Sequence, residues 1–143
     1  MSGTEATDSL TIYLALLTAD ATLQGLGISK WFKDVAQTSA DSATWPCGIG
    51  QVQSAIDVTF MSAIRVGTDI LLTFRLVGKD KDFTTILRPA YRRVDALIQG
   101  TTGSSADVII IGKAVREQFL DYSEIVNGEV YRNIGGTYRI LSQ

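Results

Sequence analysis

The chain has 143 residues, of which 45% are hydrophobic and 20% are charged, and this mixture is typical of one folded domain. The formal net charge of −2 provides no basic surface of the kind that duplex nucleic acid requires. The chain has no histidine and a single cysteine, Cys47, which excludes histidine-based catalysis and an internal disulfide. The sequence shows no secretory signal and no apolar run long enough for a membrane span, so we expect neither.

The first third of the chain predicts a helix followed by a strand. Residues 1–8 are small and polar, and we expect them to be flexible. Asp8 or Ser9 is expected to cap a helix that reaches about Thr18. Residues 19–27 predict a short helical turn closed by glycine, and residues 28–35 predict a strand. The apolar residues of the first helix that share one face are Leu10, Tyr13, Leu14 and Leu17.

The middle of the chain predicts strands of different character. Residues 45–50 contain proline and glycine and indicate an extended segment at a sheet edge. Residues 55–60 alternate, with Ile56, Val58 and Phe60 on one face, and a turn is expected near residues 67–68. Residues 69–77 form the strongest strand pattern, because Ile70, Leu72, Phe74 and Leu76 share one face. The other face of this strand is too apolar to be fully solvated, so we expect it to be covered.

Residues 82–100 predict one amphipathic helix with its apolar stripe toward the sheet. Asp82 is a candidate N-cap and Gly100 a candidate residue just beyond the C-terminus. Pro89 lies inside the pattern, where it removes a backbone donor and crowds the carbonyl of Thr85. We therefore expect a kink or an irregular first turn. The residues of the apolar stripe are Phe83, Ile86, Leu87, Ala90, Val94, Leu97 and Ile98.

The last third of the chain predicts antiparallel strands. Residues 107–111 indicate a buried strand, and residues 119–126 and 129–134 are joined by Asn127-Gly128, a strong hairpin signal. Gly135-Gly136 suggests a second turn before the last strand. The chain is thus predicted to be a single α+β domain spanning residues 1–143. Two α-helices pack on a mostly antiparallel sheet that ends in a C-terminal β-meander.

Three local patterns that resemble ligand motifs are rejected. Gly78-Lys79 lacks the first glycine of a phosphate-binding loop and the Ser or Thr that follows its lysine. Asp80 and Asp82 supply too few oxygen ligands for calcium. Residues 39–45 look like a sialidase Asp-box, but Ala43 replaces its glycine and the box occurs once. No cofactor and no metal site are predicted from these residues.

The carboxylates also give no enzyme motif. Asp121 with Glu124, or Glu117 with Asp121, are spaced closely enough to be considered as acid–base pairs. Fifteen acidic residues in the chain make such spacings inevitable, and nothing indicates that these converge in a pocket. Arginines of the terminal strands are expected to pair across strands, and a subunit interface is the alternative: Arg116, Arg132 and Arg139.

The order of these segments resembles a known family. Residues 16–23 (LLTADATL) close the first helix, a Trp45-Pro46 segment follows, and the strand DILLTF begins at Asp69. The long helix ends VDALI, and the chain closes with GTYRI after Gly135. Over roughly residues 9–141, this layout is similar to that of the tail terminator or tail completion proteins of long-tailed bacteriophages. The resemblance lies in element order and apolar pattern rather than in one invariant motif.

The resemblance implies a structural virion protein and no enzyme. The resemblance also implies that subunits of this chain form a homo-oligomeric ring, expected to be a hexamer, which caps the tail tube and joins the tail to the head. Expected partners are other copies of the chain, the tail tube protein and a head-side neck protein, with DNA passing through the lumen unread. The expected location is the tail or neck of the virion, after assembly in the host cytoplasm. Slight acidity suits a lumen that a polyanion must pass.

Two other functions stay open at this point. One is a head-completion or neck adaptor that contacts the portal side. The other belongs to a different class, a small ligand-binding or catalytic domain that uses carboxylates and tyrosines. For the ring, candidate interface residues are Arg75 and Arg65 near the central strand and Phe60 at the end of the alternating segment. Arg75 is chosen because it falls on the face away from Phe74.

Overall fold

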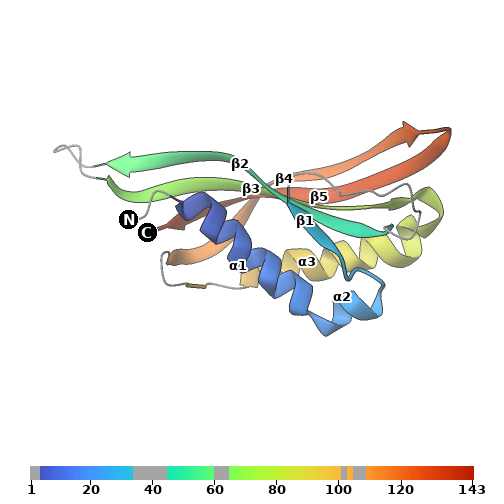
Figure 1. Cartoon of the computed structure of the whole chain (residues 1–143), viewed down its shortest axis with the longest axis horizontal. Coiled ribbons are helices and arrows are strands. Elements are labelled where there is room, and N and C mark those ends of the chain that lie inside the picture. The colour runs from blue at the N-terminus through green and yellow to red at the C-terminus, as the bar shows by residue number, and fades with distance from the viewer. Residues whose placement is uncertain (1–3, 34–44, 60–64, 101–102, 105–108) are drawn as a thin grey trace.

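The computed structural model describes residues 4–33, 45–59, 65–100, 103–104 and 109–143. It confirms the predicted α+β class: helices lie on a five-stranded sheet whose strand order is β1-β2-β3-β5-β4 (Figure 1). Only β1 and β2 are parallel, and the other neighbours are antiparallel. The elements are α1 (Glu5–Ala19), α2 (Ala21–Gly25), β1 (Trp31–Lys33), β2 (Cys47–Thr59), β3 (Arg65–Lys79), η2 (Asp80–Asp82), η3 (Phe83–Leu87), α3 (Arg88–Gly100), β4 (Ile110–Val126) and β5 (Glu129–Ser142).

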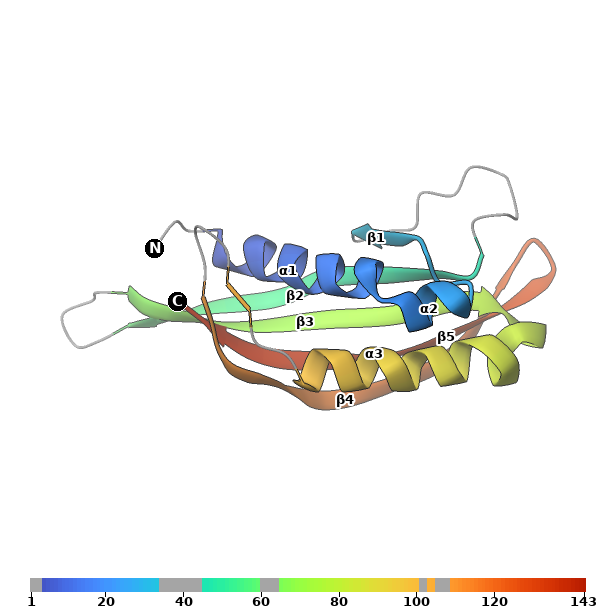
Figure 2. The same ribbon diagram turned by 90° about the horizontal axis from the view of Figure 1, so that it is seen from below.

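The helices form one layer on one face of the sheet. α1 packs over β2 and β3, whereas α3 packs over β5 and β4 (Figure 2). The opposite side of the sheet, here called the open face, carries Asp69, Leu71, Thr73, Arg75 and Val77 of β3. No helix in the described ranges lies against the open face. None of the described helices is both long and apolar enough to cross a bilayer, and the longest, α1, has 15 residues.

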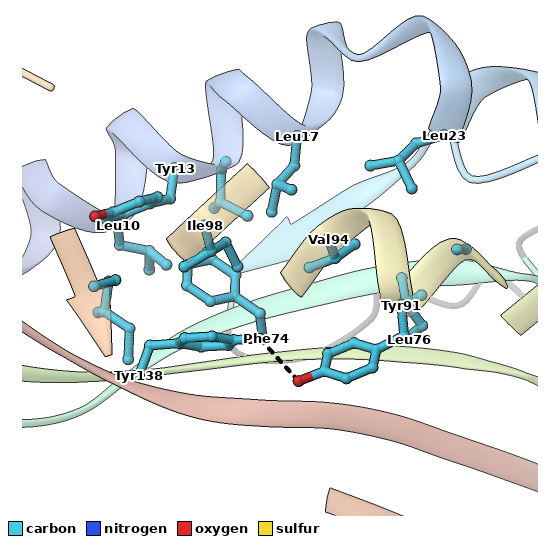
Figure 3. Close-up of a cluster of buried hydrophobic side chains, with 14 of the residues drawn as sticks. Leu10, Tyr13, Leu17, Leu23, Phe74, Leu76, Tyr91, Val94, Ile98 and Tyr138 are labelled. Carbon is cyan, nitrogen blue, oxygen red and sulfur yellow. Dashed lines mark hydrogen bonds between the residues drawn. The ribbon is translucent and has the colours of Figure 1, made fainter. Parts of the chain in front are cut away.

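The core lies between the helices and the sheet. The four β3 residues that the alternation predicted to face inward are all fully buried, which confirms that pattern. Phe74 stands at the centre, with the rings of Tyr13 and Tyr138 5.9 Å and 6.1 Å away in edge-on or tilted geometry (Figure 3). α3 is fixed to β5 by a buried polar contact, because the Tyr138 hydroxyl donates to Asp95 at 2.5 Å and meets the Tyr91 hydroxyl at 2.8 Å. Burial raises the pKa of Tyr138, so this hydroxyl stays neutral.

The first helix begins earlier than its sequence predicted. α1 starts at Glu5, and Asp8 lies within its first turn, where its carboxylate accepts from the Thr4 hydroxyl at 2.7 Å. An acidic side chain in the first turn interacts favourably with the positive end of the helix dipole. Asp8 therefore stabilises the start of the helix without capping it. The helical turn predicted after α1 is confirmed as α2. Its N-cap, Asp20, accepts from the Leu23 amide at 3.1 Å and pairs with Arg93 of α3, and this pairing lowers the pKa of Asp20.

The predicted irregularity around Pro89 is present. The chain forms a 3₁₀ turn in η2 and a π-helical turn in η3, and α3 begins only at Arg88. Pro89 follows directly on the π-helical turn, at the second position of α3, so the irregular hydrogen bonding falls where its ring and missing backbone donor disfavour a regular helix. Asp82 precedes the π turn but makes no capping hydrogen bond with its side chain. Gly100 belongs to the helix and does not adopt the left-handed conformation expected of a residue beyond its end.

Of the two turns expected among the C-terminal strands, one forms and the other does not. The Asn127-Gly128 turn is confirmed, with φ values of 52° and 78°. No second turn forms, because Gly135 and Gly136 lie inside β5, opposite Arg75 and Phe74 of β3. A Cβ on Gly135 would collide with the Phe74 carbonyl oxygen and lie 2.6 Å from the Arg75 Cα, so close strand packing is what requires glycine here. The C-terminal strands therefore form one long hairpin.

Further expectations about strands also change. Residues 110–111 and the segment predicted at residues 119–126 belong to a single strand, β4, which is mostly exposed rather than buried. Residues 107–108 lie outside the described residues. Residues 67–68 lie within β3 and form no turn. The segment at residues 45–50 is no edge, because β1 pairs outside Gly48–Gly50 of β2. Of the strand predicted at residues 28–35, the structure describes Trp31–Lys33 as strand.

Candidate subunit interface

Among the described residues, the open face is covered by its own chain at one end. Val77 of β3 and Cys47 and Ile49 of β2 are buried there, beneath partly buried aromatic residues from three segments: Phe32, Trp45 and Tyr131. The rings of Trp45 and Tyr131 lie 5.2 Å apart. The expectation that this face is covered therefore holds at the Val77 end. The cover does not extend along β3 to Asp69, because the neighbouring side chains of Ile56 and Leu141 are exposed.

The single thiol provides a test of this small cluster. Burial raises the pKa of Cys47 to about 12, so at pH 8 almost no reactive thiolate is present. In native protein at pH 8, we expect Cys47 not to react with Ellman's reagent over several hours. In urea-unfolded protein, the same thiol should react completely within that time. The absorbance of released thionitrobenzoate measures both. Rapid labelling of native protein would show that the aromatic cover opens readily.

A shallow polar hollow lies at the middle of the open face. It has a volume of about 370 Å³ and is formed where β2, β3, β5 and β4 present side chains to the same side. Its lining is made of Gln51, Gln53, Thr73, Arg75, Gln118, Leu120, Tyr122 and Thr137. At its base the buried Thr73 hydroxyl donates to Gln53 at 2.7 Å and lies 3.4 Å from that of Thr137. The hollow is thus built of hydrogen-bonding groups held by strand register.

Arg75 is anchored at the edge of this hollow by its own subunit. One guanidinium nitrogen, Nη1, donates to Asn133 at 2.7 Å and to the Tyr122 hydroxyl at 3.0 Å. The buried Asn133 in turn donates to Glu124 at 2.8 Å. A guanidinium has five donor hydrogens, and these two bonds use those of Nη1. Arg75 therefore presents a positively charged, partly satisfied group toward the hollow.

A second polar network extends along the open face. Arg139 of β5 donates to both oxygens of Asp69 on β3 at 2.8 Å and is also bonded to Glu117 on β4. This pairing lowers the pKa of Glu117 and raises that of Arg139. The contact joins three neighbouring strands, as expected for cross-strand pairing. Exposed ion pairs of this kind contribute little to stability, so they mainly fix side-chain positions.

The carboxylate pairs considered from sequence do not converge. Asp121 faces the helix side, where it pairs with Arg132 at 3.0 Å. Glu124 and Glu117 bind groups of the open face. In each considered pair, the two carboxylates therefore lie on opposite faces of the sheet. Within the ranges that the structure describes, no group of three or more Asp, Glu or Cys side chains is arranged for a metal ion. The observed geometry supplies anchored ion pairs rather than a general acid opposite a general base.

The three interface residues proposed from sequence have different outcomes. Arg75 lies on the open face as predicted. Arg65 is the first residue of β3 and pairs with Thr59, but its side chain is outside the described part of the structure. Phe60 lies outside the described residues. Tyr122 and Asn133 were not predicted from the sequence, because β5 separates β3 from β4 in the sheet. No local pattern shows that Arg75 and Tyr122, 47 positions apart, face one hollow.

Comparisons with known proteins support the fold. No family model matches the chain, and no curated protein matches it in sequence. Among solved structures, the chain is similar to one described as "Virion of native gene transfer agent (GTA) particle", with a TM-score of 0.64 and 15% sequence identity. The match covers 91% of this chain and 90% of that chain. The two chains therefore share a fold over nearly their whole lengths.

Proposed function

We propose that this chain is a structural protein of a phage-like virion. More specifically, we propose a tail terminator, acting as a homo-oligomeric ring of six subunits that caps the tail tube and joins it to the head. The observation that carries the proposal is the fold shared with a chain of a gene transfer agent virion over 91% of this sequence. The element order that resembles tail terminators supports the finer assignment. The tail tube and a head-side neck protein are the proposed axial partners.

The surface of the subunit suits assembly better than catalysis. The ionisable groups of the open face are held by neighbouring side chains, as in Arg75 with the Asn133 amide and Arg139 with Asp69. The hollow is shallow and mostly polar, whereas small-molecule sites are usually enclosed and mostly apolar. A cyclic ring requires two different patches on each subunit, one for each neighbour. A sheet with an exposed face and two different edges offers such patches.

A ring can be tested by native mass spectrometry over a concentration series, followed by electron microscopy of the purified ring mixed with tail tubes. Closed hexamers that bind tube ends would support the tail terminator. Hexamers that bind portal assemblies and ignore tubes would favour the head-side adaptor instead. A strict monomer whose melting temperature rises with one small molecule from a ligand panel would overturn the structural proposal, because a ligand of the native state stabilises it.

Arg75 is the residue whose charge we expect to serve assembly. In Arg75→Glu, the new carboxylate faces the Asn133 amide oxygen and stands near Glu124, so we expect a stability loss of about 1–3 kcal/mol. The subunit should stay folded by circular dichroism, because Arg75 lies outside the apolar core. Ring formation in native mass spectrometry should be lost, because the hollow changes from positive to negative.

The matched control for this change is Tyr122→Phe, which removes one of the two Arg75 hydrogen bonds and keeps the positive charge. We expect Tyr122→Phe to form rings. An Arg75→Glu protein that also forms rings would remove Arg75 from the interface. An Arg75→Glu protein that is unfolded would show that Arg75 serves only the subunit's own network.

A further inference from the structure

Two strands at opposite edges of the sheet have an unpaired side. β4 is the last strand in the order: Ile110 at its start donates to the Gly103 carbonyl at 2.9 Å, and no described strand lies on the outer side of the rest of β4. At the other edge, β1 pairs with Gly48–Gly50 and leaves the outer side of residues 51–59 of β2 without a strand within the described part of the chain. Each unpaired strand presents a row of backbone donors and acceptors, which is a template for pairing with another chain. Proteins normally protect such edges, so their exposure here requires an explanation.

The same two edges carry the exposed apolar side chains. All residues from Gln53 to Thr59 of β2 are exposed, including Ile56 at 64%. In β4 only Ile110, Ala114 and Leu120 are not exposed. Most large hydrophobic side chains found exposed in the described part of the chain lie on these edges: Ile56, Val58, Ile111, Val115, Phe119, Tyr122, Ile125 and Val126. A long apolar edge that stays soluble is usually covered by a partner.

The two edges also differ in charge. From Glu117 to Val126, β4 carries three acidic residues and no basic one, whereas the β1 segment carries the exposed lysines Lys30 and Lys33. Lys113 and Arg116 precede this part of β4, and Asp57 lies on the β2 edge. Acidic and basic edges attract one another and like edges repel. Charges at a contact rim add little affinity but select the partner and its orientation. The pattern therefore favours β4 of one copy beside the β1–β2 edge of another, over β4 beside β4.

The strand directions are compatible with that contact. β4 runs parallel to β3 and therefore antiparallel to β2 and β1. If a second copy continues the sheet in the same orientation, its β1–β2 edge meets β4 in the antiparallel sense, which is the slightly more stable pairing. Head-to-tail contacts of this kind use a different patch on each side and close into rings.

We propose that the ring is held together by edge-to-edge pairing, in which β4 of each subunit adds to the β1–β2 edge of the next. The occupant of each edge is a second copy of this chain. This inference rests on the proposed function, because it assigns the joint of the proposed ring. The hollow reaches Tyr122 of β4, which accepts from Arg75 at 3.0 Å, so the charge of Arg75 lies beside the pairing edge.

Blocking one edge at a time tests the proposal. Val115→Lys with Ile125→Lys places charges on β4, and Ile56→Lys with Val58→Lys places them on β2. These positions are exposed, so both variants should fold like the wild type. Neither variant alone should form a ring. A mixture of the two should give a one-to-one heterodimer in native mass spectrometry, because one intact β4 meets one intact β2 edge.

Other outcomes separate the possible failures. If β4 paired with β4, the β2 variant alone would form a homodimer, which would overturn the head-to-tail joint. Rings from either variant would overturn edge pairing while leaving the ring proposal intact. A wild-type chain that is monomeric at all concentrations and on tail tubes would remove both proposals. As a second measurement, hydrogen exchange should slow in residues 53–59 and 115–126 on ring formation, whereas unchanged exchange there would exclude backbone pairing.

Discussion

Phe74→Ala is expected to lower the free energy of unfolding by about 3–5 kcal/mol, a typical cost of removing a buried phenylalanine ring. Phe74 is fully buried on the central strand, where Tyr13 of α1 and Tyr138 of β5 pack on its ring. These neighbours belong to two different elements, so they cannot easily move together to fill the cavity. Urea denaturation followed by circular dichroism measures the change.

The control for Phe74 is Ile125→Ala. The Ile125 side chain is 75% exposed near the tip of the β4–β5 hairpin, so its truncation should change stability by less than about 0.5 kcal/mol. Equal effects of the two substitutions would contradict the placement of the core between helices and sheet. A small effect of Phe74→Ala alone would mean that the layers can close over the missing ring.

Gly135→Ala is expected to be at least as damaging, although it adds one methyl group. The new Cβ would collide with the Phe74 carbonyl oxygen and approach the Arg75 Cα at 2.6 Å. Both atoms belong to the backbone of β3, so no side chain can rotate away and the two strands must separate locally. We expect a loss of about 3 kcal/mol or more, as for severe overpacking, measured by thermal unfolding.

Gly100→Ala is the matched control for Gly135→Ala. Nothing lies within 4 Å of a Cβ at Gly100, and this residue belongs to α3. Alanine is favoured over glycine in a helix by about 0.5–1 kcal/mol, so the control should be neutral or slightly stabilising. If Gly135→Ala were equally harmless, β5 would not run continuously against β3 as described.

The sequence predicted those elements whose patterns are local. The alternation around Phe74 gave the central strand, the three- and four-residue spacing gave α3, and Asn127-Gly128 gave the hairpin. Each of these signals is a direct consequence of backbone geometry within about fifteen residues. The irregular turn before Pro89 was predicted for the same reason.

The errors fall where distant segments decide the structure. Gly135 and Gly136 resemble a turn locally, but their lack of side chains allows β5 to approach β3 and fit beneath the Tyr91 hydroxyl. The sequence pattern predicts two separate segments in place of β4, because two bulges interrupt the alternation of this strand. One bulge lies between Ile111 and Val115, and the other between Arg116 and Gln118. The hollow around Arg75 depends on the strand order, which no local pattern reveals.

The strand order also affects how the chain can be made. β5 is the last strand in the sequence, yet it lies between β3 and β4. Before its residues leave the ribosome, β3 and β4 cannot join, and the pairing of Asp69 with Leu141 spans more than half of the chain. Such long-range pairing is formed late and slowly. A growing chain therefore holds β4 without its partner, and the complete sheet arises only after synthesis has passed β5.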